Sequence, residues 1–277
     1  MKQTVDILQN LIQKYGACIG LILSLYIIGQ YGLLGLINLL SKIDDSNSRY
    51  VDFGYVYLIG FYTIIILGVT ILHINKQSFL DDNLSLWTIA LACLIRPAIG
   101  GKYETEYSNY MLILTLYLVV YILINRKAIR TISLKIVGGS LLWALSTLLI
   151  LALILASRDY KQPNISQTNP LFDFLYHLSF VVVIEETLFR GLIFGFLTLN
   201  GFKENVAFAT QGFLFWLIHF TQIGNPLAFF VFIPLLTLST TVIMKKYKTV
   251  FSPILVHLIV NMFVNSLAAW FHFHIIG

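Results

Sequence analysis

The chain has 277 residues, of which 58% are hydrophobic and only 11% are charged. A soluble domain carries about 25% charged residues, so this composition excludes an ordinary soluble enzyme and predicts a polytopic membrane protein. The net charge is +5, but no basic stripe interleaved with aromatic residues indicates a nucleic-acid partner. We therefore expect the lipid bilayer, and no nucleic acid, as the surroundings of this protein.

The apolar runs are long and continuous and show no alternation of polar and apolar residues, which excludes a β-barrel. Backbone groups inside a bilayer must satisfy one another, so the predicted fold class is all-α. The expected spans are 16–40, 53–73, 84–100, 109–125, 136–156, 171–199, 206–221, 226–244 and 252–271. Arg96 and Pro97 interrupt the third, so we predict 8–9 transmembrane helices. The sixth is long enough to be tilted, kinked or divided into two shorter helices.

Basic residues are densest at 126–135 and 245–248. Four expected spans separate these clusters, so both are predicted on the same side of the membrane, and positive charge marks the cytoplasmic side. The abundance of Ile, Leu, Lys and Asn favours a bacterial source. The predicted location is therefore the cell membrane, as a multi-pass protein of the bacterial cytoplasmic membrane.

Ionisable residues inside the expected spans lie almost entirely in the second half of the chain, with Arg96 as the exception. This asymmetry divides the chain into residues 1–133, membrane helices with no assigned role, and residues 134–277, a membrane core that carries the polar groups. A buried ionisable residue in a membrane segment is by default a functional residue.

Glu185 and Glu186 stand side by side in the sixth expected span. A carboxylate at mid-membrane depth costs about 2.5–3.5 kcal/mol, so both need a reason to be there. Glu186 and Arg190 are four residues apart with the acid first, which predicts an ion pair along the helix. Glu185 points about 100° away around the helix and has no partner there, so it is the candidate general base. A purely structural pair is the alternative, but it leaves Glu185 unexplained.

Two further polar patterns follow in the later spans. Phe215 and His219 are four residues apart, and His257, Asn261 and Asn265 form a stripe along the last span. Taken alone, each is more often a packed histidine or an interhelical hydrogen-bond ladder than a catalytic group. Taken together with the acidic pair, they are expected to converge on one site. Since the expected spans put His219 near an outer end and His257 near an inner end, convergence needs short or tilted helices.

Three motifs thus occur in order, EExxxR, FxxxH and HxxxN, each in an apolar span. Their order and spacing resemble those of the CAAX-protease and bacteriocin-processing family of membrane endopeptidases, called CPBP or Abi. The resemblance covers about residues 170–270. It implies a CAAX-protease-like helical bundle in the second half of the chain and the activity of an intramembrane endopeptidase.

The resemblance also implies roles for the residues of the three motifs. Glu185 and His219 would activate a water molecule for attack on a peptide carbonyl group. His257 and Asn261 would stabilise the tetrahedral oxyanion. The residues expected to hold the site in shape are Glu186, Arg190 and Phe215.

A metal is the competing mechanism. Glu185, His219 and His257 are ligand types that zinc accepts, and the family was long described as metalloproteases. The sequence lacks the HExxH pattern, in which two ligands and a base share one helix. We favour a glutamate protease without a cofactor, and zinc is the alternative.

The function predicted from the sequence is hydrolysis of a peptide bond in a small peptide or a membrane-anchored substrate. Since bacteria do not generally prenylate proteins, we favour peptide maturation or bacteriocin immunity over CAAX prenyl endopeptidase activity. A non-enzymatic immunity or scaffold protein in the membrane is another alternative. A proton-coupled transporter is disfavoured, because the sequence shows no inverted repeat. The sequence does not predict the oligomeric state.

Overall fold

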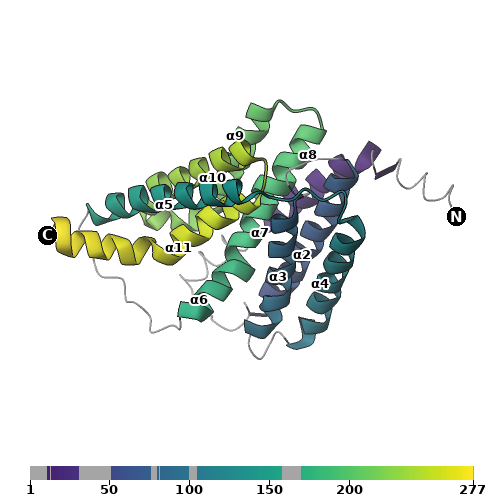
Figure 1. Ribbon diagram of the computed structural model, residues 1–277, viewed down its shortest axis with the longest axis horizontal. Helices are drawn as coiled ribbons and strands as arrows, with labels where there is room; N and C mark the ends of the chain where they lie inside the picture. The colour runs from purple at the N-terminus through teal and green to yellow at the C-terminus, as the bar shows by residue number, and fades with distance from the viewer. Residues whose placement is uncertain are drawn as a thin grey trace.

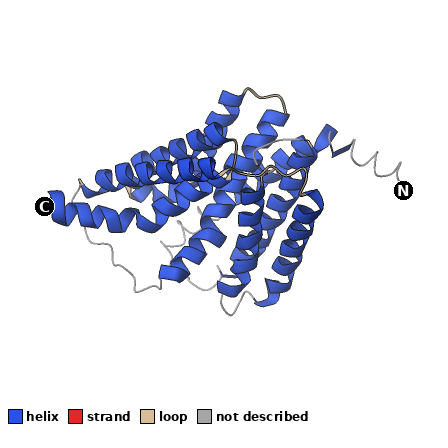
Figure 2. Cartoon of the chain, in the orientation of Figure 1, coloured by secondary structure: helices blue, strands red, loops and turns tan. Residues whose placement is uncertain are grey.

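The computed structural model describes residues 11–12, 14–30, 51–75, 80, 82–99, 105–157 and 170–276. Every regular element within these ranges is a helix, and none is a β-strand, which confirms the all-α prediction. Each of the nine expected spans overlaps with helix in the part of it that the structure describes. The first, 16–40, is described only as far as Gln30, in the helix Lys14–Gln30, and residues 31–40 lie outside the described residues (Figure 2).

The remaining elements, in chain order, are α2 (Val51–Ile74), α3 (Asn83–Ile99), α4 (Thr105–Asn125), α5 (Leu134–Ala156), α6 (Pro170–Tyr176), η1 (His177–Val182), α7 (Val183–Glu186), η2 (Thr187–Ile193), α8 (Phe194–Leu199), α9 (Glu204–Ile218), η3 (Phe220–Gly224), η4 (Ala228–Phe232), α10 (Ile233–Tyr247), α11 (Phe251–Phe271) and η5 (His272–Ile276). Of the η segments, η3 is a 3₁₀-helix and the others are π-helical.

Four helical segments in the described part of the chain are long and apolar enough to cross a membrane. They are Ser108–Asn125, Leu134–Ala156, Ala228–Tyr247 and Phe251–Ile275. Three shorter apolar helices are Lys14–Gln30, Gly60–Ile74 and Asn83–Ile99. These helices support a membrane protein with four candidate spans among the described residues, while the number 8–9 stays a prediction.

The helices form two groups, and the segment from α6 to α8, which contains Glu185 and Glu186, lies between them. Helices α2, α3 and α4 stand together on one side, and α5, α10 and α11 lie together on the other (Figure 1). The segment from α6 to α8 runs between the groups, and its η1 and α7 portions contact both α3 and α11. The two acidic residues of α7 are therefore placed where the two halves of the chain meet.

The sixth expected span is one continuous helical segment from α6 to α8, not two separate helices. Two π-helical stretches, η1 and η2, interrupt its α-helical geometry on either side of α7. Such π-turns are rare and frequently occur at functional sites, because the wider turn changes which side chains share a face. The irregular turns thus flank the four residues that include Glu185 and Glu186.

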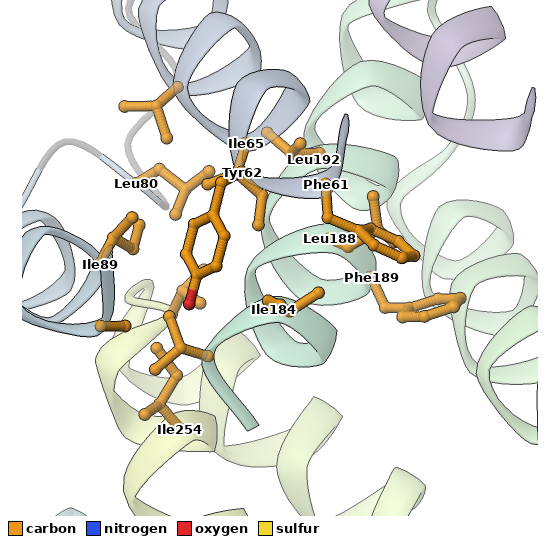
Figure 3. Close-up of a cluster of buried hydrophobic side chains, with 14 of the residues drawn as sticks. Phe61, Tyr62, Ile65, Leu80, Ile89, Ile184, Leu188, Phe189, Leu192 and Ile254 are labelled. Carbon is orange, nitrogen blue, oxygen red and sulfur yellow. The ribbon is translucent and has the colours of Figure 1, made fainter. Parts of the chain in front are cut away.

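One buried apolar cluster joins the two halves of the chain around α7 and η2. Tyr62 and Ile65 of α2 pack toward Ile184 of α7 and Ile254 of α11 (Figure 3). The Tyr62 hydroxyl donates to the backbone carbonyl of Ser179. Van der Waals packing of this kind holds helices together where lipid replaces water. The core is therefore shared between residues 1–133 and residues 134–277.

The two basic clusters predicted on one side of the membrane lie next to each other. The Arg130 guanidinium donates to the backbone carbonyl of Lys248. At the same end of α10, the Lys245 and Lys248 ammonium groups lie 3.8 and 3.0 Å from a carboxylate oxygen of Glu204. The α4–α5 loop and the α10–α11 turn thus lie side by side, which is consistent with the two basic clusters lying on one side of the membrane.

Candidate active site

The deepest part of the site is the ion pair between Glu186 and Arg190, and neither side chain has any exposed surface. Arg190 Nε lies 3.2 Å from Glu186 Oε2, one helical turn apart as the spacing predicted. Arg190 Nη2 also donates to Thr240 Oγ1 at 2.8 Å, and the guanidinium lies 3.9 Å above the centroid of the Phe215 ring. A buried ion pair is tolerated when further partners offset its desolvation, and Thr240 and Phe215 supply them here.

His257 of α11 is the second residue, after Arg190, that contacts the Glu186 carboxylate. Its Nδ1 lies 2.7 Å from Glu186 Oε1, and because the carboxylate is the acceptor, Nδ1 carries the hydrogen and donates it. This bond fixes the orientation of the imidazole ring. The other nitrogen, Nε2, consequently faces Glu185, at 4.0 Å from its Oε2.

His219 follows the last residue of α9 and approaches Glu185 from another direction. Its Nδ1 lies 2.7 Å from the backbone carbonyl of Phe215, to which it donates, so Nε2 is the nitrogen left to face the site. That nitrogen lies 3.9 Å from Glu185 Oε1. The Phe215 ring centroid is 4.7 Å from that of His219 and 6.1 Å from that of His257. Phe215 therefore packs against both imidazoles, in keeping with its expected role in shaping the site.

Glu185 lies at the point where the two histidines meet. Its side chain is 15% exposed, whereas that of Glu186 is fully buried. Each oxygen of Glu185 faces one imidazole Nε2, at 3.9 and 4.0 Å. Both distances exceed the range of a direct hydrogen bond. Of the two adjacent carboxylates, Glu185 is thus accessible and weakly held, while Glu186 is locked in place.

Two features of the helices bear on how these side chains meet although the expected spans placed them apart. Helix α9 has 15 residues, which makes it about 22 Å long and shorter than the roughly 30 Å thickness of a bilayer core. A helix of this length can end before it crosses the bilayer core, and His219, the residue that follows it, has a side chain that is 24% exposed. The α10–α11 turn contains two fully buried residues, Thr249 and Val250, so the start of α11 is packed within the fold.

Asn261 lies one helical turn after His257 on α11 and is half-buried. The described residues engage its side-chain amide in no hydrogen bond, so the structure places it near His257 without linking it to Glu185. Its role at the oxyanion stays a prediction.

Sequence reasoning missed two polar residues near the site. Thr240 of α10 receives the hydrogen bond from Arg190, and a run of hydroxyl residues in an apolar span was the signal for it. His177 begins η1 and interacts electrostatically with Glu185 and His257. Its Nδ1 is buried without a hydrogen-bond partner among the described residues. Its position two helical turns before Glu185 was the available signal.

The donor atoms expected for zinc do not form a metal site at the observed distances. Among the described residues, no three His, Cys, Asp or Glu side chains are arranged to hold a metal ion. Ligand atoms about 2.0–2.1 Å from a tetrahedral zinc lie about 3.3 Å from one another. The distances from Glu185 to His219 and His257 are 3.9 and 4.0 Å. The residues as placed do not fit the ion.

An acidic group shared by two oriented histidines within an apolar helical protein points to a membrane-embedded hydrolase. Residues 167–263 match the family described as Type II CAAX prenyl endopeptidase Rce1-like. This segment, called the Rce1-like domain below, is thus similar to the CPBP family, which confirms the resemblance seen in the three motifs. The match contains every predicted site residue and indicates a CAAX-type endopeptidase. Searches of curated proteins and of solved structures found no match to the chain.

Proposed function

We propose that the protein is an intramembrane endopeptidase in which Glu185 and His219 activate a water molecule for peptide hydrolysis. One observation carries the proposal: Glu185 faces the Nε2 atoms of two histidines, each of which is oriented by a hydrogen bond at its own Nδ1. The Rce1-like domain supports the reaction class.

The first step uses the pair formed by Glu185 and His219. Because His219 donates from Nδ1, its Nε2 is an acceptor when the ring is neutral, and Glu185 Oε1 is an acceptor 3.9 Å away. One water molecule can bridge two polar groups at that separation. As the water oxygen bonds to the carbonyl carbon, one water proton passes to Glu185. General-base assistance of this kind is worth about 10²–10⁴-fold in rate.

The oxyanion of the tetrahedral intermediate then needs hydrogen-bond donors, which α11 can supply. His257 Nε2 donates when the ring is protonated at both nitrogens, and the Glu186 carboxylate 2.7 Å from Nδ1 stabilises that cation. The Asn261 amide is the second proposed donor. Removing one oxyanion donor typically costs about 10²–10³-fold in rate. When the carbon–nitrogen bond breaks, Glu185 returns its proton to the leaving amine.

Two substrate classes follow from this reaction. The family description favours a prenylated CAAX peptide. The composition of the chain favours a bacterial substrate, and hence an unprenylated peptide precursor in maturation or bacteriocin immunity. We favour the second, since the chemistry at Glu185 requires only a peptide carbonyl and no prenyl group.

The test uses purified protein in proteoliposomes with quenched fluorescent peptides. The panel contains a farnesylated CAAX peptide, the same peptide without the prenyl group, and hydrophobic membrane-spanning peptides. The proposal expects at least one to be cleaved by the wild type and not by Glu185→Gln. Glu204→Gln is the matched control, because Glu204 is 42% exposed and pairs with Lys248 at the far end of α9. Equal cleavage by wild type and Glu185→Gln would refute it.

A further inference from the structure

A second buried polar cluster lies away from the reacting groups, where α3, the α4–α5 loop and the α10–α11 turn meet. Its centre is Asp82, which has no exposed surface. Ser85 donates to both Asp82 oxygens, from its backbone N–H and from its hydroxyl, each at 2.8 Å. Thr249 Oγ1 donates to Asp82 Oδ2 at 2.7 Å. The carboxylate thus ties the start of α3 to the turn before α11.

The same cluster holds the first residue of α11 and the backbone carbonyl of Lys248, the residue that follows α10. The Phe251 N–H donates to the Ser85 hydroxyl at 2.9 Å. Arg130 Nη2 lies 3.8 Å from Asp82 Oδ2 and donates to the Lys248 carbonyl. We call Asp82, Ser85 and Arg130, with their partners Thr249 and Phe251, the Asp82 clamp. It fixes the turn from both sides of the reversal between α10 and α11.

The negative charge of Asp82 is more than the cap at the start of α3 requires. A neutral Ser or Asn would cap α3 about equally well. Burial raises the pKa of Asp82, against the opposing hydrogen bonds from Ser85 and Thr249 and the charge of Arg130. The carboxylate is retained despite this desolvation, and only a carboxylate accepts all three hydrogen bonds while also facing Arg130.

We infer that the Asp82 clamp is a positioning device for His257, so that the amino-terminal half of the chain forms part of the catalytic unit. The inference rests on the proposed function. His257 lies six residues after Phe251, about 9 Å along a rigid helix. The clamp therefore sets how far α11 extends and how it is rotated, and with it the distance from His257 Nε2 to Glu185.

The clamp residues Asp82, Ser85 and Arg130 lie outside the Rce1-like domain at residues 167–263, whereas Thr249 and Phe251 lie inside it. The position of His257, which belongs to the domain, thus depends on residues that precede the domain in the chain. This gives residues 1–133 a role in the reaction that the family match does not contain. A displacement of about 1 Å at a reacting group can cost about 10²-fold in rate.

The test compares Thr249→Val with Thr147→Val. Thr249→Val removes one hydroxyl from the clamp and keeps the side-chain shape. Thr147 is also buried, and its hydroxyl bonds Ser239 across the α5–α10 contact, so Thr147→Val is a matched control. Two quantities are measured: hydrogen exchange of the backbone amides in the first turn of α11, and kcat and KM for the peptide that the wild type cleaves best in the panel above.

Thr249→Val is expected to speed exchange in the first turn of α11 and to lower kcat at least about 10-fold, with KM within about twofold. Thr249→Ser is expected to restore both, and Thr147→Val to leave both unchanged. An unchanged kcat in Thr249→Val, or an equal loss in Thr147→Val, overturns the inference. If the wild type cleaves no peptide, the proposed function fails separately, and unchanged exchange in Thr249→Val then overturns the clamp itself.

Discussion

Replacing Glu186 by Gln separates the carboxylate that holds the site from the one proposed to react. Glu186 is fully buried, and its two oxygens lie 3.2 Å from Arg190 Nε and 2.7 Å from His257 Nδ1. Glu186→Gln removes the negative charge and leaves the buried Arg190 guanidinium without its ion-pair partner. We expect it to lower both the stability of the fold and the activity.

The two carboxylates predict different magnitudes. Removing one partner of a buried ion pair costs about 3–5 kcal/mol of unfolding free energy. At about 2–4 °C per kcal/mol, Glu186→Gln should lower Tm by about 6–20 °C. Glu185 is 15% exposed and lies 3.9 and 4.0 Å from its two histidines. Glu185→Gln should therefore change stability by less than about 1 kcal/mol and Tm by less than about 4 °C.

Thermal unfolding of both variants in the same detergent, followed by intrinsic fluorescence, measures the difference. Cleavage in proteoliposomes at a temperature where both variants are folded measures activity. The reasoning requires Glu185→Gln to be stable and inactive, and Glu186→Gln to be destabilised. Equal losses of Tm in the two variants would show that the division of roles between the carboxylates is wrong.

Three further outcomes are expected. Arg190→Lys keeps the charge but loses the hydrogen bond to Thr240, so it should destabilise the fold by about 1.5–3 kcal/mol in the same unfolding assay, and an unchanged Tm would count against that bond. His177→Phe should raise KM by up to about 10-fold with little change in kcat, because Nδ1 of His177 has no hydrogen-bond partner among the described residues and can bond to a bound substrate; steady-state kinetics decide, and unchanged KM removes that role. Protein freed of metal by chelation should keep its activity, whereas a loss that zinc alone restores would establish the metal mechanism.

The helices could be predicted because each expected span is a long apolar run, and such a run has one stable form in a bilayer. The ends of the helices and the number of helices that cross the membrane were harder to predict. Helix α9 begins at Glu204, directly after Lys203, and lysines precede the α10–α11 turn. Composition therefore assigns both to a membrane surface and does not show where α9 ends or that Thr249 and Val250 are buried. For this reason His219 and His257 seemed to lie at different depths.

Within the site, the sequence predicted what is local. The ion pair of Glu186 with Arg190 follows from a spacing of four residues on one helix. The hydrogen bond from His257 to Glu186 joins two helices and could not be read from spacing. Neither could the Asp82 clamp, since Asp82 precedes a helix and appears in sequence as an ordinary capping residue. His177 was missed because it belongs to none of the three motifs.

The most direct test of the account compares the membrane peptides of cells that express the wild type with those of cells that express Glu185→Gln at the same level. Quantitative mass spectrometry identifies precursors and their cleavage products. The account predicts a precursor that accumulates only with Glu185→Gln, together with the loss of its carboxyl- or amino-terminal fragment. Identical precursor and fragment populations in the two cell lines, with both proteins folded in the membrane, would contradict it.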